Sequence, residues 1–220
     1  MSPCALHLTG YGPSVYTWSV RLALAETGAA YRFTDVDPFT DQGQTALAGL
    51  HPFGRVPVLD HGGFRIWETA AILDYVDATF GGGRMTPEAP AARARMRQVI
   101  SIVDAYGYWP MVRQVCSQVV FAPMEGAVPD TADIERGLAR AAPVLAALDQ
   151  IAAEGLVLAP GAMSLADVHL LPMVDYFALA PQGRAALGRT RALEHWYARL
   201  CARGTVQATR PVLVNNEGGS

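Results

Sequence analysis

The hydrophobic positions of the first 80 residues follow two different periods. A β-strand is predicted where apolar and polar residues alternate or where several apolar residues form a short run. A helix is predicted where apolar residues recur every three or four positions. Strands are predicted at 5–9, 31–36, 56–60 and 64–68, and helices at 14–27, 40–50 and 69–80. The last two strands are separated only by the turn HGG, which is typical of a β-hairpin. The predicted order is therefore βαβαββα.

The remainder of the chain shows only helical spacing. Helices are predicted at 91–118, 131–154, 164–179 and 190–203. Pro143 lies inside the second of these helices and predicts a kink or a break there. The segment GGGRMTPEAP between the two parts is rich in glycine and proline, as linkers are. We expect an α/β domain over residues 1–82 and an all-α domain over residues 91–220.

The composition narrows the classes of function. With 51% hydrophobic and 17% charged residues, the 220-residue chain has enough apolar side chains for a folded core. A net charge of -3 without a cluster of lysine or arginine argues against a nucleic-acid partner. No apolar run is long enough to span a membrane, and the first residues do not resemble a secretion signal. We therefore expect a cytoplasmic protein without a membrane partner.

The spacing of cysteine and histidine does not favour disulfide or metal chemistry. The three cysteines lie far apart, with no CxxC pair, and the five histidines include no HExxH sequence. We therefore expect reduced thiols and no metal.

The corner between the first strand and the first helix, GYGPSV, has part of the GxGxxG motif of dinucleotide-binding proteins. Gly10 and Gly12 match its first two glycines, but Val15 stands where the third is needed. Asp35 and Asp37 follow at the place of a ribose-binding acid. A nucleotide fold also requires a further parallel strand, whereas a hairpin is predicted here. Nucleotide binding is therefore the weaker interpretation of this corner.

Four segments together carry a resemblance to a known family. They are SVYTWSVRLALAE in the first predicted helix, HPFGRVPVL before the third strand, WETAAILDYV at the third helix and MSLADVHLLPM in the second domain. Over residues 5 to about 205 the chain resembles the cytosolic glutathione transferases, in particular bacterial, serine-type members similar to the zeta and phi classes. The resemblance implies a thioredoxin-like domain followed by an all-α domain. It also implies a homodimer, with glutathione as co-substrate and no other cofactor.

By this resemblance, the glutathione site lies beside the third and fourth strands. Pro57 is implied to follow a cis peptide bond, and the main chain of Val56 to pair with the cysteinyl part of glutathione as an added strand does. Glu68 would bind the amino group and Thr69 the carboxylate of the γ-glutamyl end, while Arg55 would approach the glycyl carboxylate. From the residues alone, Pro57 is an ordinary trans proline, Thr69 a helix cap and Arg55 a solvent-facing side chain.

The reacting group would be the glutathione thiol, whose unperturbed pKa of about 8.5 leaves little thiolate at pH 7. A hydroxyl donor and the positive end of a helix both favour the thiolate, and Ser14 supplies both because it begins the first predicted helix. The resemblance to zeta- and phi-like members implies this role for Ser14. Tyr11, at the end of the first strand, is the alternative hydroxyl, and Tyr16 is a third candidate. On the residues alone, Ser14 only caps its helix.

The second domain is implied to hold the electrophilic substrate. The segment DAYGYWPMVRQV offers aromatic and flexible side chains for a hydrophobic wall. The residues that we assign to this wall are Tyr106, Trp109, Met111 and Val112. The same stripe at helical spacing is also typical of a core. Ser164 and Asp167 form a Ser-x-x-Asp capping box, which is a folding element.

The expected function is that of a glutathione transferase, which conjugates glutathione to small hydrophobic electrophiles, as in detoxification. A glutathione-dependent peroxidase, isomerase or dehalogenase would use the same site. A non-catalytic glutathione-binding or regulatory protein is the alternative from a different class, because a fold does not determine an activity.

Overall fold

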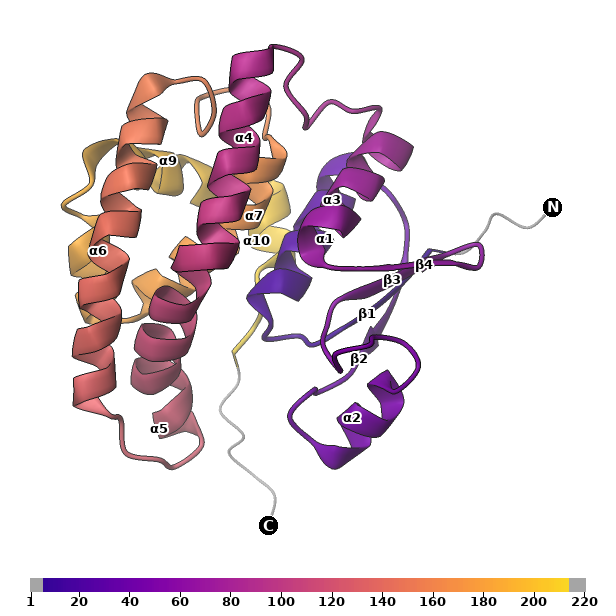
Figure 1. Cartoon of the computed structure of the whole chain (residues 1–220), viewed down its shortest axis with the longest axis horizontal. Helices are drawn as coiled ribbons and strands as arrows, with labels where there is room; N and C mark the ends of the chain where they lie inside the picture. The colour runs from indigo at the N-terminus through magenta and orange to yellow at the C-terminus, as the bar shows by residue number, and fades with distance from the viewer. Residues whose placement is uncertain (1–5, 214–220) are drawn as a thin grey trace. The chain divides into compact units, whose positions relative to one another are not determined.

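The computed structural model describes residues 6–213 of the chain, which are drawn in colour in Figure 1. The chain forms two compact units, residues 6–85 together with Gly204–Val212, and Thr86–Arg203. The helix α10 (Gly204–Thr209) therefore belongs to the first unit, whereas the sequence analysis places this segment in the second domain. None of the helices within residues 6–213 is long and apolar enough to cross a membrane.

The first unit is built around a four-stranded mixed sheet. Its elements are β1 (Leu6–Gly10), α1 (Val15–Thr27), β2 (Arg32–Asp35), α2 (Asp41–Leu47), β3 (Val58–His61), β4 (Phe64–Trp67), α3 (Thr69–Val76) and the π-helical turn η1 (Asp77–Gly81). The strand order is β2-β1-β3-β4, with β2 parallel to β1, β3 antiparallel to β1 and β4 antiparallel to β3. The predicted βαβαββα order and the thioredoxin-like fold are confirmed (Figure 1).

Helix α1 begins and ends where its sequence predicts. Ser14 is its N-cap and accepts a hydrogen bond from the backbone N–H of Thr17 at 3.3 Å. Gly28 ends the helix in the left-handed conformation that glycine adopts readily (φ 70°). The apolar face of α1 packs against α3 and α10, which removes a large hydrophobic area from water. Fully buried residues of this core include Leu8, Trp18, Leu22, Leu59 and Ile72.

The second unit is helical throughout its regular elements. These are α4 (Pro90–Ile102), η2 (Val103–Gly107), η3 (Trp109–Phe121), α5 (Ala122–Met124), α6 (Thr131–Glu154), α7 (Leu165–Leu179), α8 (Pro181–Leu187) and α9 (Arg191–Cys201), of which η2 and η3 are π-helical. Every residue of α7 from 165 to 177 is buried, so this helix forms the centre of the unit. The predicted all-α second part is confirmed.

Two expectations for this unit, a break at Pro143 and a single helix over 91–118, are wrong. Helix α6 runs without a break through Pro143, because this proline is exposed and water can reach the carbonyl that lost its partner. The single helix expected over 91–118 is instead α4 followed by the wider turns of η2 and η3. Gly107 is a weak helix former and Pro110 has no N–H for the α-helical ladder, which explains the change there.

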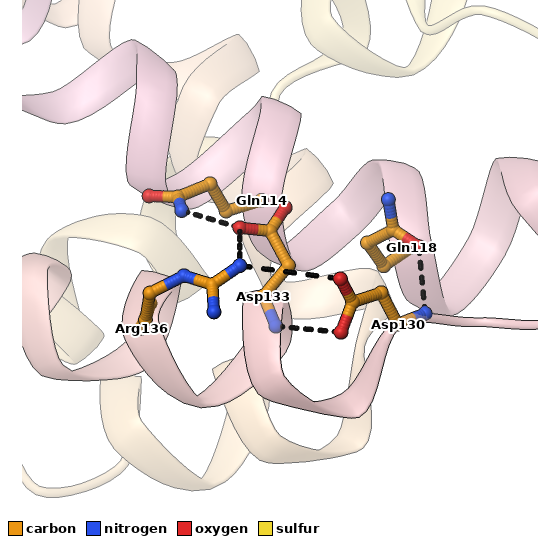
Figure 2. A network of polar contacts seen from close by, with 5 residues as sticks. All are labelled: Gln114, Gln118, Asp130, Asp133 and Arg136. Atoms are coloured by element: carbon orange, nitrogen blue, oxygen red, sulfur yellow. Dashed lines mark hydrogen bonds and ion pairs between the residues drawn. The ribbon is translucent and has the colours of Figure 1, made fainter.

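A polar network connects η3 to α6 (Figure 2). Nε2 of Gln114 donates to Oδ1 of Asp133 at 2.7 Å, and Arg136 donates to the same oxygen at 3.0 Å. Asp130 caps α6 by accepting from the N–H of Asp133 at 3.0 Å, and its own N–H donates to Gln118 at 2.9 Å. The hydrogen bond from Gln114 is the main cause that lowers the pKa of Asp133 below its usual value.

The predicted capping box at the start of α7 is confirmed. The N–H and the hydroxyl of Ser164 donate to Oδ2 of Asp167 at 2.7 and 2.6 Å. Nε1 of Trp196 in α9 donates to Oδ1 of the same carboxyl at 2.7 Å. Burial raises the pKa of Asp167, and these hydrogen bonds oppose the rise. The box therefore caps the N-terminus of α7 and also joins α7 to α9.

Candidate active site

Three strands of the first unit meet at one edge of the sheet. Thr9 in β1 pairs with Val58 in β3, and Val58 pairs with Trp67 in β4. The next residues in this direction are the last of β1, Pro57 and Glu68, and because neighbouring strands are about 4.8 Å apart, this row spans roughly 10 Å. Helices α1 and α3 begin at this edge and pack against each other. The partial positive charges of two helix N-termini therefore lie close together, which suits an anionic ligand.

Ser14 lies at this edge, four residues after β1 ends. Its backbone N–H donates to the carbonyl of Tyr11 at 2.9 Å, which closes the turn between strand and helix. Its Oγ accepts from the N–H of Thr17, and the side chain is half-buried. Within residues 6–213 the hydroxyl has no hydrogen bond in which it is the donor, so its proton is available to a ligand.

The two alternative hydroxyls flank Ser14 in the sequence. Tyr11 is half-buried, its N–H donates to Oγ1 of Thr17 at 3.2 Å, and its ring meets that of Phe39 edge-on with centroids 6.0 Å apart. Tyr16 lies in the first turn of α1 and is also half-buried. Of the three candidates, Ser14 alone is the N-cap residue, where the helix dipole adds to the effect of a hydroxyl.

The structure excludes the dinucleotide interpretation of this corner. Oδ1 of Asp35 accepts from the N–H of Gly12 at 2.9 Å and holds the turn between β1 and α1, and Asp37 accepts from the N–H of Phe39 at 2.8 Å within its own loop. Gly10 is needed for packing, because a Cβ there would lie 2.4 Å from the side chain of Thr17. In addition, β3 runs antiparallel to β1, where a dinucleotide-binding half requires a parallel strand.

The loop 51–57 brings Val56 and Pro57 to the sheet edge. The Val56–Pro57 peptide bond is cis, as the resemblance implies. Pairing of β3 with its neighbours begins only at Val58, so the described sheet does not use the main chain of Val56. Nε2 of Gln44 in α2 donates to the carbonyl of Gly54 at 3.3 Å, and this hydrogen bond fixes the loop to α2.

Sequence reasoning assigns no role to His51, although it begins the HPFGRVPVL segment. The residue is buried, its Nδ1 accepts from the N–H of Phe53 at 3.1 Å, and its ring lies 5.2 Å from that of Trp67. Burial lowers the pKa of His51, against a smaller opposing effect of the Glu68 carboxylate. The hydrogen bond and ring contact of His51 therefore hold the loop that leads to Pro57.

Helix α3 begins without a side-chain cap. Glu68 is its N-cap residue and makes no side-chain cap hydrogen bond, while Thr69 is its first helical residue. The alternative in which Thr69 only caps the helix is therefore wrong, and the first N–H groups of α3 remain available to an acceptor. Glu68 has a φ of 70°, where a side chain is strained, and such strain is retained mainly at functional sites.

In the second unit the residues assigned to a substrate wall separate into two groups. Tyr106 and Trp109 are exposed, with 67% and 57% of their surfaces accessible. Met111 and Val112 are buried on η3, which packs against α6 and α7. Their placement in the wall is corrected, because the packing of η3 against α6 and α7 encloses both side chains in the core of the unit.

A buried histidine supports the same segment. Nε2 of His169 in α7 lies 2.8 Å from Oδ1 of Asp104 in η2, two residues before Tyr106. His169 is fully buried, so this contact fixes the η2 turn against α7. No three His, Cys, Asp or Glu side chains converge within residues 6–213 as a metal centre would require.

Known proteins are similar to this chain in sequence and in fold. Residues 5–78 match the family model for the glutathione S-transferase N-terminal domain. Glutathione S-transferase F10 of Arabidopsis thaliana is 29% identical over 202 residues, which cover 89% of this chain and 93% of that protein. A probable maleylacetoacetate isomerase of Caenorhabditis elegans is 32% identical over 104 residues, which cover 47% and 48%. The apo structure of glutathione S-transferase III has the same fold, with a TM-score of 0.82 at 23% identity over 96% of this chain and 99% of that one.

The first unit is thus a thioredoxin-like domain of the glutathione S-transferase type. The similarity to Arabidopsis transferases extends over most of the chain and includes the helical second unit. The first unit therefore contains a glutathione S-transferase N-terminal domain, and the resemblance to the cytosolic glutathione transferases seen in the sequence is confirmed.

Proposed function

We propose that the chain is a glutathione transferase that binds glutathione at the sheet edge of its first unit and directs the thiolate at small hydrophobic electrophiles. Three features support the proposal because they lie at the same edge of the sheet. They are the Ser14 corner, the cis-Pro57 turn and the uncapped start of α3. Glutathione carries two carboxylates, an ammonium group and a thiol, and this edge offers matching N–H groups, an acid and a hydroxyl.

Each part of glutathione has a proposed partner. The main chain of Val56 pairs with the cysteinyl part, and the N–H groups at the start of α3 hold the γ-glutamyl carboxylate together with the Thr69 hydroxyl. Glu68 binds the γ-glutamyl ammonium group. Arg55, which is exposed, binds the glycyl carboxylate.

The proposed reaction begins with ionisation of the bound thiol. The hydroxyl of Ser14 donates to the sulfur and the N-terminus of α1 adds partial positive charge, so the pKa of the thiol falls and its proton leaves to solvent. The thiolate then forms a bond to the electrophilic carbon and displaces a leaving group as an anion, or it opens a double bond or ring, and the resulting anion takes a proton from solvent. Sulfur supplies the electron pair, so the step needs no further cofactor.

The electrophile is proposed to contact Tyr106 and Trp109, whose exposed rings suit a hydrophobic substrate. We assign glutathione binding to the domain predicted over residues 1–82 and electrophile binding to the helical domain predicted over residues 91–220, from which α10 is excluded because it belongs to the first unit. We also propose a cytoplasmic homodimer, as the resemblance to cytosolic transferases implies.

Retention on immobilised glutathione, followed by assays with an aryl halide, an organic hydroperoxide and an epoxide, tests this function. Turnover by the retained protein supports the enzyme. Retention without any turnover favours the non-catalytic binding protein, and a chain that is neither retained nor active contradicts the proposal. Thr69→Ala should weaken retention, and Thr69→Ser, which keeps the hydroxyl, is its matched control.

Isomerisation is a second candidate, favoured by the similarity of 104 residues to the probable maleylacetoacetate isomerase. A thiolate that adds to a conjugated double bond and leaves again permits rotation about that bond, and glutathione is not consumed. Conversion of maleylacetoacetate to its trans isomer with catalytic glutathione would favour this function over conjugation.

A further inference from the structure

A pocket of about 820 Å³ lies in the second unit, and none of its lining residues has a role in the proposed reaction. The carboxy-terminal end of α6, the segment 155–160, the α8 side chain Arg184 and one side of α9 form its wall. All of its lining residues fall between 149 and 199, so the pocket is complete within one unit. Its volume is in the range of small-molecule sites.

Helix α9 presents a basic stripe to this pocket. Arg191, His195 and Arg199 are spaced by four residues and therefore share one face of the helix. Arg191 and Arg199 are about 12 Å apart along the helix axis. Because arginine stays charged at all ordinary pH values, the stripe offers two permanent positive charges at a fixed separation.

The two carboxylates in the wall already have partners. Glu194 accepts from Arg184 at 2.9 Å, and Oδ1 of Asp149 accepts from two N–H groups at the start of α9 at 2.8 and 2.9 Å. Arg191 makes no side-chain hydrogen bond or ion pair with any residue in 6–213. It also occupies the first position of the helix, where the dipole disfavours a cation. Its guanidinium group is therefore available to an anionic ligand.

Arg199 and Leu158 give a second, independent indication. Arg199 donates to the carbonyl of Leu158 at only 3.4 Å, and its Nε is buried without an acceptor among the described residues. Such buried donors are rare and point to a missing partner. Leu158 has a φ of 55°, and the only other described non-glycine residue with a positive φ is Glu68 at the proposed glutathione edge. Strain of this kind is typical of ligand sites.

The wall between the charges is largely apolar and includes Ala152, Ala159 and Pro160. We infer that the pocket binds an elongated dicarboxylate with an apolar middle, one carboxylate on Arg191 and the other on Arg199. Pairs of guanidinium and carboxylate are among the strongest hydrogen-bonded contacts in proteins and fix both ends of such a ligand. The inference does not depend on the proposed transferase reaction.

Calorimetric titration of the whole protein, saturated with glutathione, tests the inference with nonanedioate as the probe. Nonanoate has the same apolar chain with one carboxylate, and butanedioate is too short to reach both arginines. We expect nonanedioate to bind about tenfold more tightly than either, because each charge-assisted contact contributes roughly that factor. Equal affinity for nonanedioate and nonanoate overturns the inference.

Arg191→Gln changes an exposed side chain and should lower the affinity for nonanedioate about tenfold. Arg189→Gln removes a neighbouring exposed arginine outside the pocket and should leave it unchanged. Arg199→Gln should also lower the affinity for nonanedioate about tenfold. If the Arg199→Gln variant does not fold, the result for Arg191→Gln decides the test. Wild-type affinity in Arg191→Gln overturns the inference. A lack of turnover would contradict the proposed function alone, because the titration does not require it.

Discussion

The indole Nε1–H of Trp18 donates a hydrogen bond to Oγ1 of Thr209 at 3.0 Å and so joins α1 to α10 across 191 positions of the chain. Both side chains are buried. Oγ1 of Thr209 also donates to the carbonyl of Thr205 at 2.8 Å, so this hydroxyl serves two partners at once. The end of the described chain therefore closes the core of the first unit, next to the helix that begins at Ser14.

Thr209→Val should lower the free energy of unfolding of the first unit by about 1–3 kcal/mol, because the Trp18 N–H is then buried without an acceptor. Hydrogen exchange of residues 15–27 together with urea unfolding measures this effect. Thr209→Ser keeps the hydroxyl and should stay close to wild type. If the valine variant is as stable as the serine variant, the hydrogen bond contributes nothing measurable.

This contact also shows where sequence reasoning stops. The bounds of α1 are predictable because Ser14 and Gly28 act within one turn of the helix ends, and the Ser164 capping box is equally local. The pairing of Trp18 with Thr209 has no local signal, since it depends on the return of a distant segment. The cap of α9 is of the same kind, because Asp149 comes from α6.

The candidate site was predictable to a similar extent. The HPFGRVPVL segment indicated Pro57, because the fixed spacing of this motif identifies the loop that contains the proline. The buried position of His51 inside the same motif was not evident, since a histidine in a loop gives no sign of its surroundings. Met111 was placed in a substrate wall because helical spacing is the same for a wall and a core, and only packing against α6 separates them.

Ser14→Ala should slow conjugation most strongly near pH 6.5 and shift the rising limb of the pH–rate profile to higher pH. Loss of a hydrogen bond to a charged group corresponds to an increase of about one to two units in the pKa of the bound thiol. At high pH, where the thiol ionises unaided, the rates should converge. Steady-state kinetics from pH 5.5 to 9 at saturating glutathione measures this, and the KM for glutathione should change little.

The same substitution removes the N-cap of α1, so a control must separate folding from chemistry. Ser14→Asp keeps a cap acceptor but cannot donate to sulfur, and it should fold like wild type and remain slow. An unchanged rate in Ser14→Ala would transfer the role to another hydroxyl. Tyr11→Phe and Tyr16→Phe then identify which one.

Glu68→Gly should make the protein more stable by about 1 kcal/mol and at the same time raise the KM for glutathione. Glycine adopts a φ of 70° without strain, which outweighs its larger entropy in the unfolded chain, but it has no carboxylate for the ammonium group. Glu68→Gln separates the two effects, because it keeps the strained backbone and removes the charge. The idea fails if the glycine variant is less stable than the glutamine variant.

In the Asp133→Asn variant, stability should fall less steeply as the pH is lowered. The folded state lowers the pKa of Asp133, so its contribution is present above the unfolded value of about 3.9 and is lost as the pH falls through the lower folded value. Urea midpoints at pH 7, 4, 3 and 2.5 should fall less steeply in the variant, which starts from lower stability at pH 7. Glu135→Gln removes an exposed carboxylate of the same helix and should follow the wild-type slope.

Cys116 should resist alkylation in the folded protein. Its thiol is fully buried, and burial, with a smaller effect of the Asp175 carboxylate, raises its pKa to about 12, so almost no thiolate exists at pH 8. Iodoacetamide treatment followed by peptide mass spectrometry should find Cys116 unmodified until urea unfolds the second unit, with half-buried Cys201 as an internal reference. Asp175→Asn should leave Cys116 protected, because burial is the larger cause. If the variant becomes reactive while it remains folded, the carboxylate rather than burial suppresses the thiolate.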